Sequence, residues 1–257
     1  MRDAVHAEWT KLRTVPSSGW LLIAIIALTV GVSALATSIV KCPGTCDADT
    51  TKLSLTGIML GQAAVAAIAV VVVTAEYGTG MIRVSLAAVP RRSVLLAAKA
   101  VMVTAVVLVA GSISVLGSVL AGRTQLPGNG FTAARGFEAL SLLHGPTLRA
   151  AAGSVLYLVL IGLFTLGIST ALRDAGLTTA VVLGFLYVVP LISYVIISPV
   201  WQRRLDRWAP TNAGLAIQAT RNLGKLPIGP WAGLGVLGLW TAAALAGGWL
   251  VLRLRDA

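Results

Sequence analysis

Long apolar runs separated by short polar breaks dominate the chain. Six of these runs contain few or no charged side chains and are about 20 residues long or longer, which is the length that spans the hydrocarbon core of a bilayer as a helix. Backbone groups in lipid need internal hydrogen bonds, and no alternation with a period of two appears, so helices rather than barrel strands are predicted. The predicted spans are residues 19–40, 53–75, 93–121, 150–172, 176–200 and 230–252.

Several polar or proline residues shape these predicted spans. The third is long enough to tilt or to extend beyond the bilayer. Only Arg173 and Asp174 separate the fourth from the fifth, which predicts a helical hairpin. Pro190 and Pro199 favour a kink or an early end of the fifth span, because proline removes a helical hydrogen bond.

Composition agrees with an all-α integral membrane protein. The 257 residues are 57% hydrophobic and only 11% charged, and their mean hydropathy is +0.88. The connections at 122–149 and 201–229 are too short for independent domains, so residues 1–257 form a single transmembrane domain. The net charge of +11 comes from basic residues between the spans, where they anchor to lipid headgroups, and this placement argues against nucleic-acid binding.

The N-terminal segment predicts a short amphipathic helix lying in the membrane interface. Val5, Trp9 and Leu12 recur at helical spacing, and Pro16 is expected to end the helix. Basic side chains occupy other positions of the helical wheel, namely Lys11 and Arg13. A plain polar lead-in is the alternative, whereas a cleavable signal peptide is disfavoured because the segment lacks an apolar core.

Charge counting does not settle the orientation. Half of the 20 lysine and arginine residues fall on each side of the predicted topology. The N-terminal tail and the basic segment 83–99 favour cytoplasmic termini, because the first helix usually dominates orientation. Cys42 and Cys46 then lie outside, where a disulfide would persist, although two free thiols fit the sequence equally well.

The sequence offers little for catalysis or ion coupling. All acidic residues lie in tails, loops or span ends, and Lys99 is expected to snorkel to the interface, so a proton or sodium relay is disfavoured. His6 and His144 fall on opposite sides, which argues against a metal site or a catalytic triad built on both. Gly224 and Lys225 lack the remainder of a phosphate-binding loop. We therefore expect no enzyme activity in this chain, no metal and no directly bound cofactor.

Two further patterns concern helix contacts. Gly57 and Gly61 have the four-residue spacing that lets a neighbouring helix approach closely. Residues 76–92, EYGTGMIRVSLAAVPRR, connect the second and third spans and carry an apolar face at helical spacing. This predicts a short surface helix suited to docking into a partner's groove, with a solvated basic loop as the alternative.

The same segment resembles the loop of the type 2 family of ABC transporter permeases. The family's form is EY-x-x-G-[TM]-I-R followed by a leucine and a proline-arginine pair. The matching region is Glu76, Tyr77, Gly78, Thr79, Gly80, Met81, Ile82, Arg83, Leu86, Pro90 and Arg91. The opening AEWTKLRTVPSSGW (7–20), PWAGLGVLGLW (230–240) and the last residues RLRDA are also similar to family members, especially actinobacterial ones.

The resemblance implies an exporter subunit in the plasma membrane with both termini in the cytoplasm. Its partners would be a second permease copy, identical or related, and ABC subunits that bind ATP and Mg, with residues 76–92 as the coupling helix. The apolar character of the spans suits a hydrophobic or amphipathic solute, such as an antibiotic, peptide or lipid. The alternative function is a non-transporting membrane scaffold or sensor that docks a signalling partner through residues 76–92.

Overall fold

A computed structural model describes residues 2–14, 16–43, 46–78, 80–81, 92–137 and 139–254. Within these ranges the chain is mostly helical and forms no strand. Six of its helices are long and apolar enough to cross a membrane. In chain order they are α2 (Pro16–Ile39), α4 (Ile58–Gly78), α6 (Arg92–Gln125), α7 (Gly145–Leu172), α8 (Ala175–Leu183) continuing into α9 (Val189–Val195), and α12 (Pro230–Leu254).

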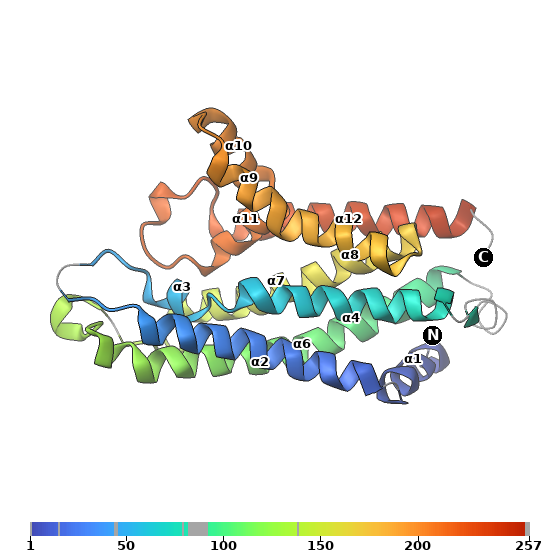
Figure 1. Cartoon of the computed structure of the whole chain (residues 1–257), viewed down its shortest axis with the longest axis horizontal. Helices are drawn as coiled ribbons and strands as arrows, with labels where there is room; N and C mark the ends of the chain where they lie inside the picture. Colours follow the sequence, from blue (N-terminus) through green and yellow to red (C-terminus); the bar gives the residue numbers. More distant parts are fainter. Residues whose placement is uncertain are drawn as a thin grey trace.

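Four shorter helices lie outside the spans. α1 (Arg2–Thr14) precedes the first span, and α3 (Thr50–Ser54) precedes the second. α10 (Pro199–Trp208) and α11 (Pro210–Leu215) lie between the fifth and sixth spans. The two termini lie at one end of the bundle, which we call the terminal end, and α3 lies at the opposite end (Figure 1).

Each of the six predicted spans coincides with one of these helices, but several boundaries differ. The third helix extends to Gln125, and the fourth begins at Gly145. The second span begins at Ile58 because residues 50–54 form the separate helix α3. The fifth was predicted to reach residue 200, whereas its membrane-spanning stretch ends at Ser193. A π-helical turn, Gly184–Val188, precedes Pro190 in α9, and Pro199 starts α10. The fifth span therefore ends early, before Pro199, as the sequence predicted, whereas the helix continues through Pro190 to Val195.

α7 is the central helix of the bundle. It packs against α12, α6 and α4 (Figure 1). Tyr157, Leu158, Ile161 and Leu166 are completely buried on it. In contrast, in α2, in α8–α9 and in α12 only 22% of the most apolar 18-residue stretch is buried inside the protein. The outer faces of these three spans are thus available to lipid or to another protein.

Glycines bring the helices close together. A Cβ atom on Gly57 would lie 1.9 Å from the Thr29 carbonyl oxygen, and one on Gly61 would lie 2.0 Å from Thr29 Oγ1. The predicted close approach at this pair is therefore a contact of α2 within the same chain. In α12 a Cβ atom on Gly248 would lie 2.5 Å from the Gly167 carbonyl oxygen of α7, whereas Gly247 faces open space.

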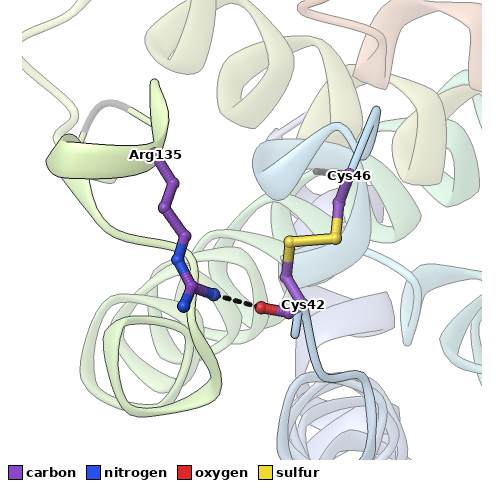
Figure 2. Close-up of a disulfide and its surroundings, with 3 residues drawn as sticks. All are labelled: Cys42, Cys46 and Arg135. Atoms are coloured by element: carbon purple, nitrogen blue, oxygen red, sulfur yellow. Dashed lines mark hydrogen bonds between the residues drawn. A yellow bond between two sulfur atoms is a disulfide. The ribbon is translucent and has the colours of Figure 1, made fainter. Parts of the chain in front are cut away.

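A disulfide closes the first loop at the opposite end of the bundle. Cys42 and Cys46 are bonded, with their Cα atoms 6.0 Å apart, so the disulfide alternative holds. The guanidinium of Arg135 donates to the Cys42 carbonyl oxygen (Figure 2). The Cys42 amide donates to the Asn129 carbonyl oxygen at 2.9 Å. A small second core forms around this bridge, comprising Cys42, Leu126, Phe131, Phe137 and Leu140.

Asp49 joins this end of the bundle to the loop before α12. One carboxylate caps α3 through the Lys52 amide at 3.1 Å and accepts the Thr220 hydroxyl at 2.7 Å and the Arg221 amide at 2.9 Å. The Arg221 side chain in turn stacks over the Phe137 ring, 4.7 Å from its centroid. The first loop, the loop before α7 and the loop before α12 are therefore held together by polar and cation–π contacts as well as by the small core around the disulfide.

Candidate functional site

The predicted coupling segment is described only at its margins. Glu76, Tyr77 and Gly78 form the last turn of α4, and Gly80 and Met81 follow it. Gly80 has a φ of 70°, a left-handed conformation that glycine adopts without strain, so the chain turns sharply here. The other predicted coupling residues lie outside the described residues: Thr79, Ile82, Arg83, Leu86, Pro90 and Arg91.

Glu76 is buried between helices rather than exposed at a membrane edge, with only 5% of its surface exposed. Its Oε1 accepts a hydrogen bond from Lys99 Nζ of α6 at 2.8 Å and one from Lys11 Nζ of α1 at 2.6 Å. Its Oε2 is also buried and has no hydrogen-bond partner among the described residues. The base of the predicted coupling segment is therefore held by two cations from other helices.

Glu8 completes the arrangement from α1. Its Oε2 accepts from Lys99 Nζ at 3.0 Å, and its Oε1 accepts from Lys11 Nζ at 3.0 Å. We call Glu8, Lys11, Glu76 and Lys99 the charge cluster. Its two carboxylates balance its two ammonium groups, and it joins α1, α4 and α6 at one point.

The expectation that Lys99 snorkels to the interface is wrong for this structure. Only 5% of the Lys99 side chain is exposed, and its ammonium group donates to Glu8, Glu76 and the Val72 carbonyl oxygen, the last at 2.9 Å. An ammonium group has three N–H donors, so the set is complete. Burying a charged ammonium group costs desolvation energy, and a lysine that extends to the headgroups avoids this cost. Here two carboxylates within hydrogen-bonding distance offset it instead.

Lys11 is the most accessible member of the charge cluster. Burial lowers the pKa of its ammonium group, but the hydrogen bonds and negative charges of Glu76 and Glu8 outweigh that effect, so the net pKa is raised above its ordinary value. Lys11 therefore remains charged at every physiological pH. The apolar residues predicted to share one face of α1 have different surroundings in the structure. Val5 packs against the main core, whereas Trp9 is 50% exposed. The side chains of the other predicted interfacial residues, Leu12 and Arg13, lie outside the described residues.

Arginines extend the contacts around the charge cluster to α12. Arg173, the C-cap of α7, lies over the Tyr77 ring, 5.5 Å from its centroid, and donates to the Val251 carbonyl oxygen at 3.4 Å. Arg92, the first residue of α6, donates to the Leu252 carbonyl oxygen at 2.5 Å. Both cations lie where the last carbonyls of a helix carry partial negative charge. The ends of α4, α6, α7 and α12 are thus joined at the terminal end.

The charge cluster has little free space beside it. The cavity beside it, lined by Val73, Glu76, Tyr77 and Lys99 among others, has a volume of only about 10 Å³. That space holds at most one water molecule. Breaking such a buried pair leaves an uncompensated charge, so the three helices that share the cluster are expected to move together.

The two histidines lie at different ends of the bundle. His6 lies on α1 at the terminal end, and His144 is the N-cap residue of α7 at the opposite end. No cluster of metal-ligating side chains occurs among the described residues. Gln62, which the sequence places deep in a span, is fully buried and accepts a hydrogen bond from the Tyr157 hydroxyl. Its Nε2 has no partner among the described residues.

No family model and no curated protein sequence matches this chain.

Sequence reasoning identified Glu76 but missed Lys11 and Lys99 as its partners and Glu8 as the second carboxylate of the charge cluster. Glu8 was treated as part of an interfacial tail, and Lys99 as a headgroup anchor. A usable signal was present, since Lys99 lies inside an apolar helix and a buried lysine requires a carboxylate partner. Glu76 lies at the end of the preceding span, so an antiparallel pairing of the two spans brings the charges together.

Proposed function

We propose that this chain is the membrane-spanning subunit of an ATP-driven exporter, with ATP hydrolysis supplied by a separate subunit. The solute would be hydrophobic or amphipathic, in keeping with the apolar spans. The resemblance of residues 76–92 to the coupling loop of type 2 ABC permeases supports the proposal. A second copy of the permease, identical or related, would complete the pathway.

The observation that carries the proposal is the charge cluster at the base of that loop. Glu76 is the first residue of the loop, and its carboxylate is held by Lys99 on the span that follows the loop and by Lys11 on α1. A displacement of the loop by an ATPase would therefore be transmitted to α1, α4 and α6 together. A simple solvated linker between two spans would need no such buried ion pairs, which cost desolvation energy.

The outer surface of the bundle also fits a subunit that works in an assembly. α2, α8–α9 and α12 leave most of their apolar surface uncovered. Glycines without close neighbours, such as Gly235, Gly238 and Gly247, lie on α12. Such surfaces can accept lipid chains, a second permease or an amphipathic solute at the boundary between copies. ATP and Mg would bind to the partner ATPase.

The direct test is purification of the full chain from its native membrane, with identification of the proteins that accompany it. The expected partner is an ATPase with a phosphate-binding loop. In nanodiscs, Arg83→Ala in the predicted coupling segment should lower ATP hydrolysis on the order of tenfold, equivalent to about 1.4 kcal/mol of coupling. The matched control is Arg123→Ala, an exposed arginine in the last turn of α6 at the opposite end, which should leave hydrolysis unchanged.

Either of two results overturns the proposal. The first is the absence of any co-purifying ATPase. The second is equal ATP hydrolysis by the Arg83→Ala and Arg123→Ala proteins. If a signalling protein is recovered instead, and Glu76→Gln alters its output without changing the efflux of any compound, the chain is a scaffold or sensor rather than a transporter.

A further inference from the structure

α10 is a short and strongly cationic helix. Its ten residues, PVWQRRLDRW, contain three arginines, two tryptophans and a single acidic residue. Only residues 196–198 separate it from α9, and Ser198 is its N-cap residue. It projects sideways from the bundle, away from the spans (Figure 1). A short cationic helix that directly follows a span lies at the depth of the membrane interface.

The arginines and tryptophans of α10 face away from the protein. Arg203, Arg204, Arg207, Trp201 and Trp208 are all exposed. On a helical wheel the arginines form one arc and the tryptophans the adjacent arc, while Gln202, Leu205 and Asp206 lie on the remaining side. These last three residues are only partly exposed. The outward surface of α10 is therefore cationic along one edge and aromatic along the other.

Contacts with the rest of the protein fix this orientation. Asp206 accepts a hydrogen bond from Asn212 Nδ2 of α11 at 2.7 Å, so the negative charge of α10 is turned inward. Trp240 Nε1 of α12 donates to the Trp208 carbonyl oxygen at 3.0 Å, and Arg207 Nε donates to the Pro227 carbonyl oxygen at 3.2 Å. The Arg204 guanidinium lies over the Trp201 ring, 5.3 Å from its centroid. These hydrogen bonds fix which side of α10 faces the bundle.

Exposed apolar side chains lie just before α10 and in its first turn. Val195 is 72% exposed and Ile197 97%, and Val200 of α10 is 52% exposed. Exposed apolar side chains next to a membrane span are removed from water when they lie among lipid acyl chains. Tryptophan prefers the boundary between acyl chains and headgroups. The arginines above that boundary then lie level with lipid phosphates, to which guanidinium groups bind in a bidentate manner.

We propose that α10 is a binding surface for anionic phospholipids, with Trp201 and Trp208 at the acyl boundary and Arg203, Arg204 and Arg207 on the headgroup phosphates. Anionic headgroups would collect around the loop that joins the fifth and sixth spans. This inference rests on α10 alone and does not depend on the proposed transport function. Attraction of about 1 kcal/mol for each basic residue near a charged surface corresponds to about a fivefold enrichment per arginine.

The test uses the full chain in vesicles of neutral phosphatidylcholine with a minor fraction of phosphatidylglycerol. Bromine is placed on the acyl chains of either lipid, and quenching of tryptophan fluorescence reports which lipid surrounds the protein. Quenching by brominated phosphatidylglycerol should exceed quenching by an equal fraction of brominated phosphatidylcholine. The excess should fall several-fold in the Arg203→Gln/Arg204→Gln/Arg207→Gln protein and should weaken with added salt.

The matched control removes the same charge from the same end of the bundle but not from α10. Lys41, Lys52 and Lys225 are exposed, and the Lys41→Gln/Lys52→Gln/Lys225→Gln protein should keep the excess quenching. Because Arg207 also contacts Pro227, the Arg203→Gln/Arg204→Gln protein provides a second variant that leaves this bond intact.

Two outcomes overturn the proposal. One is an equal loss of excess quenching in the control and α10 variants, which would assign it to net charge alone. The other is complete suppression of the excess by millimolar soluble glycerol phosphate, which would make α10 a site for a dissolved anion rather than for a lipid surface.

Discussion

Lys99 Nζ lies 2.8 Å from Glu76 Oε1, and this ion pair joins α6 to the last turn of α4 just before the predicted coupling segment. Both side chains are about 95% covered by protein, since only 5% and 6% of their surfaces remain exposed. The pair does not stand alone, because Glu8 and Lys11 bring α1 to the same point.

Removing the central cation should therefore destabilise the fold strongly. Lys99→Met leaves Glu8 and Glu76 buried with Lys11 as their remaining partner in the cluster, and we expect a loss of about 3–5 kcal/mol in the free energy of unfolding. The measurement is the unfolding of the detergent-solubilised chain. Lys52→Met, which removes an exposed lysine at the opposite end, should change it by less than about 0.5 kcal/mol.

A compensating variant distinguishes charge from packing. Glu8→Gln/Glu76→Gln/Lys99→Met removes both uncompensated carboxylates, and it should recover a large part of the stability that Lys99→Met loses. If the triple variant is as unstable as the single one, the loss comes from side-chain packing and the charge cluster is not the cause.

Adjacent glycines in α12 give a second comparison. Gly248→Ala places a Cβ atom 2.5 Å from the Gly167 carbonyl oxygen, so α12 must move away from α7, whereas Gly247→Ala meets nothing within 4 Å. We expect Gly248→Ala to cost about 1–3 kcal/mol. Gly247→Ala should be neutral or stabilising by up to about 1 kcal/mol, because alanine favours helix. Thermal unfolding of the two variants measures the difference, and equal midpoints would contradict this contact.

The carboxylate of Asp49 should be the main polar link between the first loop and the loop before α12. Asp49→Ala removes the acceptor for the Thr220 hydroxyl and for the amides of Thr220, Arg221 and Lys52. The expected cost is roughly 1–3 kcal/mol, because these donors lose their partner. Hydrogen exchange at residues 219–222 should accelerate. Asp47→Ala serves as the control, since Asp47 is exposed and accepts hydrogen bonds from the Asn222 side chain alone among the described residues.

Because the pKa of Lys11 is raised in the folded state, the stabilisation that Lys11 provides should be lost at alkaline pH. A group whose pKa is higher in the folded state stabilises that state fully below its ordinary pKa, here 10.5, and the contribution is lost as the pH rises through the folded value. The difference in unfolding midpoint between the wild type and Lys11→Gln should thus be constant from neutral pH to about pH 10. Above that it should shrink. A difference that instead disappears in mild acid would assign the effect to the carboxylates alone.

The two cysteines report membrane orientation. They are the chain's only cysteines and are bonded to each other. If the opposite end lies outside the cell, a membrane-impermeant reductant applied to intact cells should expose both thiols to an impermeant maleimide. A cysteine introduced by His6→Cys into a Cys42→Ser/Cys46→Ser chain should be labelled only after permeabilisation. The reverse pattern would place the termini outside.

Apolar runs predicted the six spans because a helix in lipid is specified by a local property, its length of uncharged sequence. The same reasoning predicted the early end of the fifth span before Pro199, since proline acts on its own helix. It failed at the beginning of the second span, where polar residues before Ile58 fold into α3 and Asp49 caps that short helix. The cap depends on one side chain rather than on average hydropathy.

The charge cluster was harder to predict because its members are separated by 91 and 23 residues. Each charge taken singly has an ordinary explanation: an interfacial tail for Glu8, a loop boundary for Glu76 and a headgroup anchor for Lys99. Only their meeting in space makes burial favourable, and that meeting depends on how α1 folds back against α6. Hydropathy along the sequence does not predict which helices contact each other.

The charge cluster also constrains the order in which the protein can be built. Glu8 leaves the ribosome 91 residues before Lys99, its partner on the third span. Before the third span enters the membrane, α1 can contact α4 through Lys11 and Glu76 but lacks its contact with α6. Helix α1 is therefore expected to dock completely only after half of the spans are inserted, and a ribosome stalled before Lys99 should hold a nascent chain whose α1 is more accessible to protease than in the finished protein.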